Sequence, residues 1–306
     1  MNLRVAILLA TYNSELYIGE QINSIIDQSY KDWVLYISDD GSIDNTPMII
    51  KEYSCKQPDK IKTLSMNKKF GAASKNFFFL LKNVYADLFF FCDQDDVWDK
   101  KKIEKYVLLY EDLNVNMQQK PVLIHSDLTV VSSNLDIIHV SMKEYSFLPK
   151  EASNPYFYLT MNNITGCSMC INITCKEFLF EYCNETILEK AIMHDWFLGL
   201  ITSFMGHIVY IDEPLILYRQ HKNNLVGATS FFSMKKILKN EDKKVFVQNL
   251  AFFSAFARKM TVEHNKFFHE YFFVQGQSKY MKYVFHKNNM MLKNGFLRKI
   301  IQVFRF

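Results

Sequence analysis

Three carboxylates follow a strongly apolar run in the middle of the chain. The stretch FFFCDQDDVWDK, residues 89–100, passes from bulky side chains to Asp93, Asp95 and Asp96. The apolar run is typical of a buried strand. Carboxylates a few ångströms apart repel one another and are costly to desolvate, so stability alone does not explain this acidic tip. It could bind a divalent cation that bridges a diphosphate, supply a paired acid and base, or form a solvated loop.

The elements around this tip alternate between strand and helix patterns. Apolar runs predict strands at 4–11, 33–42, 61–67 and 87–96, and residues at helical spacing predict a helix after each one. This alternation is typical of a doubly wound α/β unit with a mostly parallel sheet. From residue 122 to 218 the pattern is mixed, with strands at 122–131 and 207–221 and helices at 175–183 and 195–205.

Polar clusters stand where three of the predicted strands end. They are residues 11–13, 38–42 and 93–96. In open parallel sheets, ligands bind beyond the carboxyl ends of the strands. We therefore expect the three clusters to meet at one edge and to bind one ligand.

Composition and charge limit the setting of the protein. None of the apolar stretches in the 306 residues approaches the roughly 20 needed to span a membrane. The N-terminal run VAILLA ends in polar residues without a small-residue cleavage site, so we expect a strand rather than a signal peptide. The six cysteines are scattered, and Cys167 and Cys170 have no second pair nearby to complete a zinc site. We expect a cytoplasmic protein without a nucleic-acid partner.

The C-terminal part of the chain differs from the rest. From Ser233 onward the pattern is helical and rich in aromatic residues, with Phe246, Leu250, Phe253 and Ala257 expected along one face. Seven of the chain's cations follow Glu270, and no acidic residue does. The last twelve residues, GFLRKIIQVFRF, alternate apolar and basic groups, which is typical of a helix lying on an anionic membrane. The alternative is that these aromatic residues pack within the protein or form a homodimer through the C-terminal helices.

Taken together, the ordered motifs resemble those of family 2 glycosyltransferases, which have the GT-A fold. The motifs are LLATYNSELYIGEQINSI, ISDDGSIDNT, FGAASKNF, CDQDDVW, NITGCSM, HDW and YRQHKNN, and they extend over roughly residues 3 to 227. DQDDVW and YRQHKNN look most like bacterial rhamnosyltransferases of cell-surface polysaccharide synthesis. The resemblance implies a GT-A domain at 1–228, with a nucleotide-sugar half at about 1–127 and an acceptor half at about 128–228. A helical extension follows at 229–306.

The resemblance implies a binding site for a nucleotide diphosphate sugar, with dTDP and UDP as the candidate nucleotides. Tyr12 would stack on the base, and Asp40, or Asp39 in its place, would accept the N3 hydrogen of a pyrimidine. Turn formation in DDGS is the alternative role for these two acids. Lys75 stands where many relatives carry arginine, which makes a phosphate contact beside Asn76 less certain. The full set of expected donor-binding residues is Thr11, Tyr12, Asn13, Asp39, Asp40, Gly71, Asn76, Asp93 and Arg219.

The resemblance also implies a metal, Mn²⁺ or Mg²⁺, and inversion at the anomeric carbon. Asp95 and His221 are the expected metal ligands, and Asp96 could substitute for Asp95 or for Asp93. A base must take the proton of the acceptor hydroxyl, and Asp195 in HDW occupies the position of that base. Its alternative role is to cap the following helix, and His194 is a weaker candidate base.

The remaining predictions concern the acceptor and the reaction class. Gly166 and Trp196 are expected to line the acceptor pocket, although Trp196 could belong to the core. The acceptor would be a saccharide or a lipid-linked saccharide, and the enzyme could lie peripherally on the inner face of the plasma membrane. We favour transfer of L-rhamnose from dTDP-L-rhamnose. The alternatives are a UDP-hexose or UDP-N-acetylhexosamine transferase, or a catalytically silent nucleotide-sugar binding or assembly protein. HKNNLVGATS, residues 221–230, is expected to form a lid over the donor.

Overall fold

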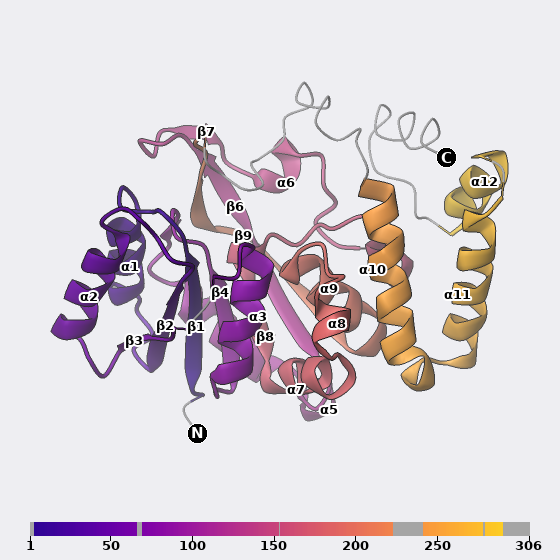
Figure 1. The fold of residues 1–306 in the computed structure, drawn as a ribbon, viewed down its shortest axis with the longest axis horizontal. Coiled ribbons are helices and arrows are strands. Elements are labelled where there is room, and N and C mark those ends of the chain that lie inside the picture. The colour runs from indigo at the N-terminus through magenta and orange to yellow at the C-terminus, as the bar shows by residue number, and fades with distance from the viewer. Residues whose placement is uncertain (1–2, 66–68, 153, 223–240, 278, 290–306) are drawn as a thin grey trace.

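The computed structural model describes residues 3–65, 69–152, 154–222, 241–277 and 279–289. Within them a mixed, nine-stranded sheet has the order β3-β2-β1-β4-β8-β6-β9-β5, with β7 paired to β6 (Figure 1). The strands are β1 (Val5–Thr11), β2 (Trp33–Asp39), β3 (Ile61–Thr63), β4 (Leu88–Cys92), β5 (Val97–Trp98), β6 (Val122–Val131), β7 (Ile137–His139), β8 (Met169–Asn172) and β9 (His207–Arg219).

The first half of the sheet is parallel, as the sequence predicts. β1 lies between β2 and β4 and is parallel to both, and β3 is parallel to β2. The second half is mixed, because β8 runs antiparallel between β4 and β6 while β9 is parallel to β6. The helices are α1 (Ile18–Ile26), α2 (Thr46–Lys56), α3 (Ala73–Asn83), α4 (Lys102–Asp112), α5 (Val115–Gln118), α6 (Met142–Tyr145), α7 (Ile173–Tyr182), α8 (Glu185–Leu188), α9 (His194–Met205), α10 (Glu241–Phe256), α11 (Val262–Gln275) and α12 (Lys279–Asn288). Short 3₁₀ turns are η1 (Pro155–Leu159), η2 (Gly166–Ser168) and η4 (Ala257–Lys259).

The sheet has a hydrophobic core on each face. Alternate residues of a strand point to opposite faces, so Phe89 and Phe91 of β4 belong to one core and Phe90 belongs to the other. The Phe90 core is covered by α1, α2 and α4, and the other core by α3, α7, α9, α10 and α11. Full burial of a phenylalanine contributes about 1.5–3 kcal/mol, so this central strand is a strong anchor for the polar residues that follow it.

The C-terminal helices pack on the α9 side of the sheet (Figure 1). Phe252 and Phe256 of α10 are fully buried in the same core as Phe197 of α9. Of the residues predicted to share one face, Leu250 is 46% exposed and Ala257 lies beyond the helix in η4, so this face is not the one that α10 buries most deeply. Helical periodicity groups residues on a face, but packing against the rest of the chain selects the face that is buried.

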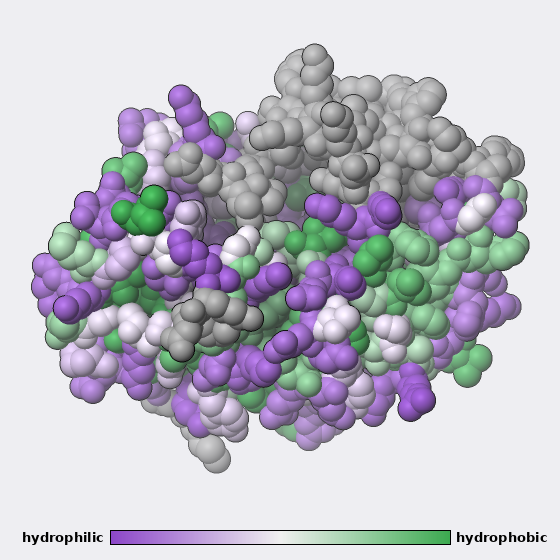
Figure 2. Space-filling model, in the orientation of Figure 1, coloured by the Kyte–Doolittle hydropathy of each residue, from purple (hydrophilic) through white to green (hydrophobic). Residues whose placement is uncertain are grey.

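The outer surface of these helices includes exposed apolar side chains. Figure 2 shows hydrophobic residues among hydrophilic ones over the side of the molecule where α10 to α12 lie in Figure 1. Phe273 of α11 is 68% exposed.

Three predictions lie wholly or mostly outside the described residues. They are the domain boundary at 228/229, most of the lid at 221–230 and the tail GFLRKIIQVFRF. Among the residues described, none of the helices is both long and apolar enough to cross a membrane.

Candidate functional site

The polar tips of β1 and β4 lie side by side and are joined by Gln94. The strands are in register, with Leu9 opposite Cys92, so the residues that follow them meet at one edge. The side-chain oxygen of Gln94 accepts hydrogen bonds from the Thr11 hydroxyl at 2.8 Å and from the Tyr12 backbone N–H at 2.7 Å. Gln94 belongs to the predicted polar cluster 93–96, but no individual role was predicted for it. Its position between acids at a strand end was the signal that could have indicated it.

The tip of β2 is organised by its two acids. Asp39 accepts a bond at 2.9 Å from the backbone N–H of Ser42 and another from its hydroxyl, and so forms the turn. Asp40 accepts from the backbone N–H of Phe70 and, at 2.8 Å, from that of Gly71. Gly71 has a φ of +68°, a conformation that L side chains rarely adopt, and this lets the loop close on Asp40.

Two of the expected donor-binding residues are asparagines whose side chains bind the backbone of neighbouring segments. Asn13 has a φ of 49°, which asparagine tolerates, and its side-chain oxygen accepts from the Ile43 backbone N–H at 2.9 Å. Asn76 is buried in α3, and its side chain donates to the Ser38 carbonyl at 2.9 Å. Residues 11–13, 39–42 and 93–96 together are called the strand-tip edge below.

A cavity of about 760 Å³ extends from the strand-tip edge to the start of α9. Its other side, residues 164–166 and 192–196, is called the helix edge below. The cavity brings together most of the predicted site residues, namely Thr11, Tyr12, Asp40, Gly71, Asn76, Asp93, Asp95, Gly166, Asp195 and Trp196. Four predicted residues are not among its lining residues: Asn13, Asp39, Arg219 and His221.

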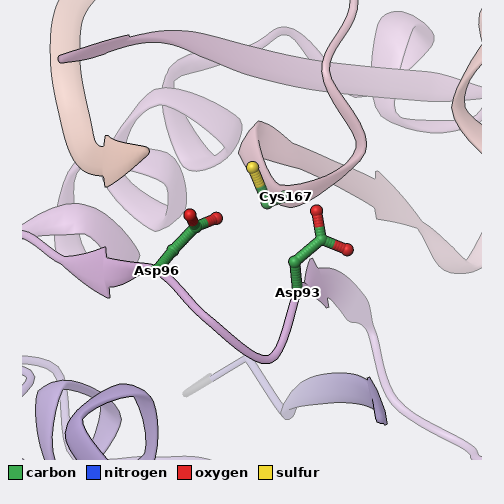
Figure 3. A group of neighbouring side chains, drawn as sticks. All are labelled: Asp93, Asp96 and Cys167. Atoms are coloured by element: carbon green, nitrogen blue, oxygen red, sulfur yellow. The ribbon is translucent and has the colours of Figure 1, made fainter. Parts of the chain in front are cut away.

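The acidic tip is a compact group of ionisable side chains. Asp93, Asp96 and Cys167 point toward one another, and each offers an atom within 4.8 Å of the other two (Figure 3). Burial, followed by the charges of Asp95 and Asp195, raises the pKa of Asp93 to about 7. Asp96 is fully buried, which raises its pKa well above the usual value. Burial therefore favours the protonated carboxyl groups at this tip, and a bound cation would favour their ionised forms.

Asp95 and His221 are in direct contact, although 125 residues of chain separate them. The His221 Nε2 atom lies 2.8 Å from Asp95 Oδ2, and the imidazole stacks on Tyr17 with ring centroids 4.8 Å apart. Burial raises the pKa of Asp95, while His221 opposes that shift. One carboxylate and one imidazole, with further carboxylates beside them, fit a divalent cation that completes its shell with phosphate oxygens and water. These residues could hold the expected metal.

Arg219 lies behind the acidic tip. Its side chain is 2% exposed and donates from Nε to the Asp95 carbonyl at 2.7 Å and from Nη1 to the Ser133 carbonyl at 2.5 Å. Its other guanidinium nitrogen pairs with Glu20. Its backbone N–H donates to Asp96 at 3.0 Å. The structure therefore places Arg219 where it holds the backbone of the tip, at a distance from the cavity surface.

Asp195 lies in the first turn of helix α9, at the opposite side of the cavity. It is 8% exposed, and its Oδ1 atom accepts from the Trp196 backbone N–H at 2.6 Å. Burial raises the pKa of its carboxyl to about 7, a value suited to accepting a proton near neutral pH. A Cβ on Gly166 would lie 2.7 Å from the His194 ring and 3.7 Å from Asp195 Oδ2, so glycine is needed for this close approach.

Burial lowers the pKa of His194, whereas it raises that of Asp195. The His194 ring contacts both Phe77 and Phe91, with centroids at 4.2 and 5.2 Å, and burial lowers its pKa to about 3. A group with so low a pKa is a weak base.

The Trp196 ring nitrogen donates to the Tyr158 carbonyl at 2.7 Å, which fixes the indole at the cavity wall.

Sequence reasoning missed Lys102, which lies beneath the acidic tip. It is fully buried, its Nζ donates to the Cys167 carbonyl at 2.7 Å, and it lies 3.4 Å from the centroid of the Trp98 ring. Desolvation lowers its pKa to about 8. Tyr106 follows Lys102 by four residues, so a lysine on the same helical face as an aromatic residue was the signal available in the sequence.

Two comparisons bear on this geometry. The model of the Glycosyl transferase family 2 domain matches residues 6–173. The dTDP-rhamnosyl transferase RfbG of Shigella flexneri is 34% identical over 235 residues, which are 74% of this chain and 76% of that protein. The chain belongs to glycosyl transferase family 2. It is a glycosyltransferase, and the cavity between the strand-tip edge and the helix edge is its candidate active site.

Other members of this enzyme family and its fold show the same likeness. The glucosyltransferase WfgD of Escherichia coli, which acts on α-D-GlcNAc-diphosphoundecaprenol, is 33% identical over 113 residues, or 37% of this chain and 43% of that one. The structure of residues 1–349 of S. aureus TarS in complex with UDP-GlcNAc superimposes with a TM-score of 0.56 at 15% identity, covering 98% of this glycosyltransferase and 89% of that solved chain. The fold is therefore of the GT-A type, with a helical C-terminal part, as the resemblance implied.

Proposed function

We propose that this glycosyltransferase transfers L-rhamnose from dTDP-L-rhamnose, with inversion, to a saccharide or lipid-linked acceptor in surface polysaccharide synthesis. The observation that carries the donor is the 34% identity to a dTDP-rhamnosyl transferase over 235 residues. The cavity supports it, because its lining includes the apolar residues Phe77, Leu148 and Ile164. Such a surface suits a sugar that lacks the 6-hydroxyl.

The nucleotide would bind along the strand-tip edge. The Tyr12 ring is 49% exposed, which leaves its face available to a pyrimidine. Asp40 is held by the Phe70 and Gly71 backbone N–H groups, and it would accept the pyrimidine N3 hydrogen with a further lone pair. Asp93 would bind the sugar of the nucleotide.

A divalent cation, Mn²⁺ or Mg²⁺, would be held by Asp95 and His221 and would stabilise the negative charge of the departing diphosphate. Asp195 would accept the proton of the acceptor hydroxyl as that oxygen bonds to the anomeric carbon. Trp196, fixed by Tyr158, would contact the acceptor sugar, and Gly166 leaves room beside Asp195. Arg219 would act through the backbone of the acidic tip, which it anchors.

A donor panel tests this function. Purified protein with Mn²⁺ is offered dTDP-L-rhamnose, UDP-glucose and UDP-N-acetylglucosamine, and both binding and sugar transfer are measured. We expect binding of dTDP-L-rhamnose to raise the melting temperature, because a ligand bound only to the native state stabilises it. Transfer from UDP-sugars alone would reject rhamnose and favour the second candidate, a UDP-hexose transferase. That candidate is favoured by the 33% identity to a UDP-Glc-dependent glucosyltransferase over 113 residues.

The basic C-terminal tail would bring the enzyme to an anionic membrane, where a lipid-linked acceptor lies. Each cation near such a surface contributes about 1 kcal/mol, and salt screens the attraction. We expect the full-length protein to sediment with anionic vesicles at low salt and to be released at high salt. Equal binding after truncation near Gln277 would reject this role of the tail.

A further inference from the structure

Helix α10 of the C-terminal part carries two consecutive buried amides. Gln248 and Asn249 are both 0% exposed, and they lie next to the aromatic core that contains Phe252. Burying an amide costs free energy unless its hydrogen bonds are replaced. The contacts of this amide pair therefore indicate what the two residues do.

Gln248 holds the segment that leads into Asp195. Its side-chain oxygen accepts a hydrogen bond from the Ile192 backbone N–H at 2.8 Å. Ile192 lies between α8 and α9, outside any helix or strand, and both Ile192 and Met193 line the cavity. Met193 is the N-cap residue of α9 and makes no side-chain capping bond. The direction in which α9 starts is therefore set in part by α10.

Asn249 holds the segment that fixes Trp196. Its side-chain nitrogen donates to the Leu159 carbonyl at 2.8 Å and to the Tyr271 hydroxyl of α11 at 2.9 Å. The neighbouring carbonyl, that of Tyr158, accepts from the Trp196 indole at 2.7 Å. Gln248 thus holds the segment that precedes Asp195, and Asn249 holds the segment whose carbonyl binds the Trp196 indole.

We propose that Gln248 and Asn249 are positioning residues for sugar transfer, which act by holding the helix edge from the C-terminal helices. The inference rests on the proposed function, because it takes Asp195 as the base. Neither amide lines the cavity, and the donor-binding groups at the strand-tip edge are held by other contacts. The amide pair therefore acts on the transfer step and leaves donor binding unchanged.

Substitution of Gln248 tests this inference. Gln248→Met keeps the length of the side chain but removes the acceptor oxygen, and Gln248→Glu keeps an acceptor. The matched control is Leu250→Met on the exposed side of the same helix. We measure donor affinity by calorimetry, kcat with a saturating acceptor, and hydrogen exchange of the peptide that contains Ile192.

We expect Gln248→Met to lower kcat by about tenfold or more, since displacing a catalytic group by about 1 Å is enough for such a loss. Donor affinity should equal that of the wild type, and the Ile192 amide should exchange faster. Gln248→Glu should recover part of the rate, and Leu250→Met should match the wild type. If Gln248→Met does not fold, Gln248→Asn, whose amide is too short to reach Ile192, replaces it with the same expectation.

Several results would overturn the inference. They are an unchanged kcat, an unchanged Ile192 exchange, or a parallel loss of kcat and donor affinity, which would indicate general damage. Asn249→Leu provides a second test, with a raised KM for the acceptor expected from a loosened Trp196. A wild-type protein that transfers no sugar from any nucleotide donor would instead refute the proposed function. In that case, faster Ile192 exchange in Gln248→Met would still report the contact.

Discussion

The strand-tip edge and the helix edge of the cavity are built in different ways. At the strand-tip edge, short polar side chains bind the backbone of neighbouring turns, as Gln94 binds Tyr12 and Asp40 binds Gly71. At the helix edge, Asp195 depends on Gly166 for space, and the segment before it depends on Gln248, from a helix late in the chain. One edge follows from where parallel strands end, and the other from long-range packing.

Under the proposed function, this difference would separate donor binding from sugar transfer. The strand-tip edge, where Gln94 and Asp40 hold neighbouring turns, would bind the nucleotide. A buried carboxylate whose pKa is raised to about 7 is suited to a proton transfer, and burial of that kind requires a complete core around it. The four predictions below test whether binding and transfer can be changed independently.

The largest effect is expected from Asp195→Asn. The amide keeps the shape of the carboxyl group but cannot accept the hydroxyl proton, so transfer should fall by roughly a hundredfold or more. Donor affinity, measured by calorimetry, should stay at the wild-type value. A fully active variant would move the base elsewhere, and a parallel fall in donor affinity would show that the two edges are not independent.

Asp95→Ala should act on the strand-tip edge alone. Loss of a metal ligand should weaken Mn²⁺-dependent donor binding by at least about tenfold, the lower limit seen for groups that only support such ligands. The melting temperature without donor should not fall, because one of three crowded carboxylates is removed. Calorimetry with and without Mn²⁺ measures the first expectation and thermal unfolding the second. Undiminished Mn²⁺-dependent affinity would exclude Asp95 as the ligand.

The pH dependence of transfer should report the ionisation of Asp195 at the helix edge. Asp195 must be ionised to accept a proton, and its pKa is raised to about 7 by burial. The rate should therefore rise about tenfold per pH unit well below pH 7 and level off above it. The pH dependence of kcat with saturating donor and acceptor tests this. A limb centred near pH 4 would contradict it, because that is where an exposed carboxyl group titrates.

The smallest effect is expected from Tyr12. Stacking of an aromatic ring on a base contributes about 1–3 kcal/mol, so Tyr12→Ala should weaken donor binding by about tenfold while Tyr12→Phe has little effect. The saturating rate should not change in either variant. A lowered kcat in Tyr12→Ala would link the strand-tip edge to the transfer step.

The sequence by itself determined the strand-tip edge. Runs such as 88–92 must be buried strands because they are apolar throughout, and consecutive parallel strands bring their polar ends to one side. Asp40, Asp93 and Tyr12 therefore line the cavity as predicted from local pattern and order. The resemblance to family 2 placed Asp95 and His221 together, and the structure brings them to 2.8 Å.

Only the tertiary structure decided what surrounds these groups. Arg219 was expected to bind the donor, but its guanidinium is buried against Asp95, Ser133 and Glu20, because contacts across 86 to 199 residues of chain leave no local pattern. Periodicity grouped Phe246, Leu250 and Phe253 on one face of α10, but packing against the core selected Phe252 and Phe256 for full burial. The pKa of Asp195 likewise depends on burial, which no spacing of residues encodes. Local order determined which groups are present, and packing decided their environment.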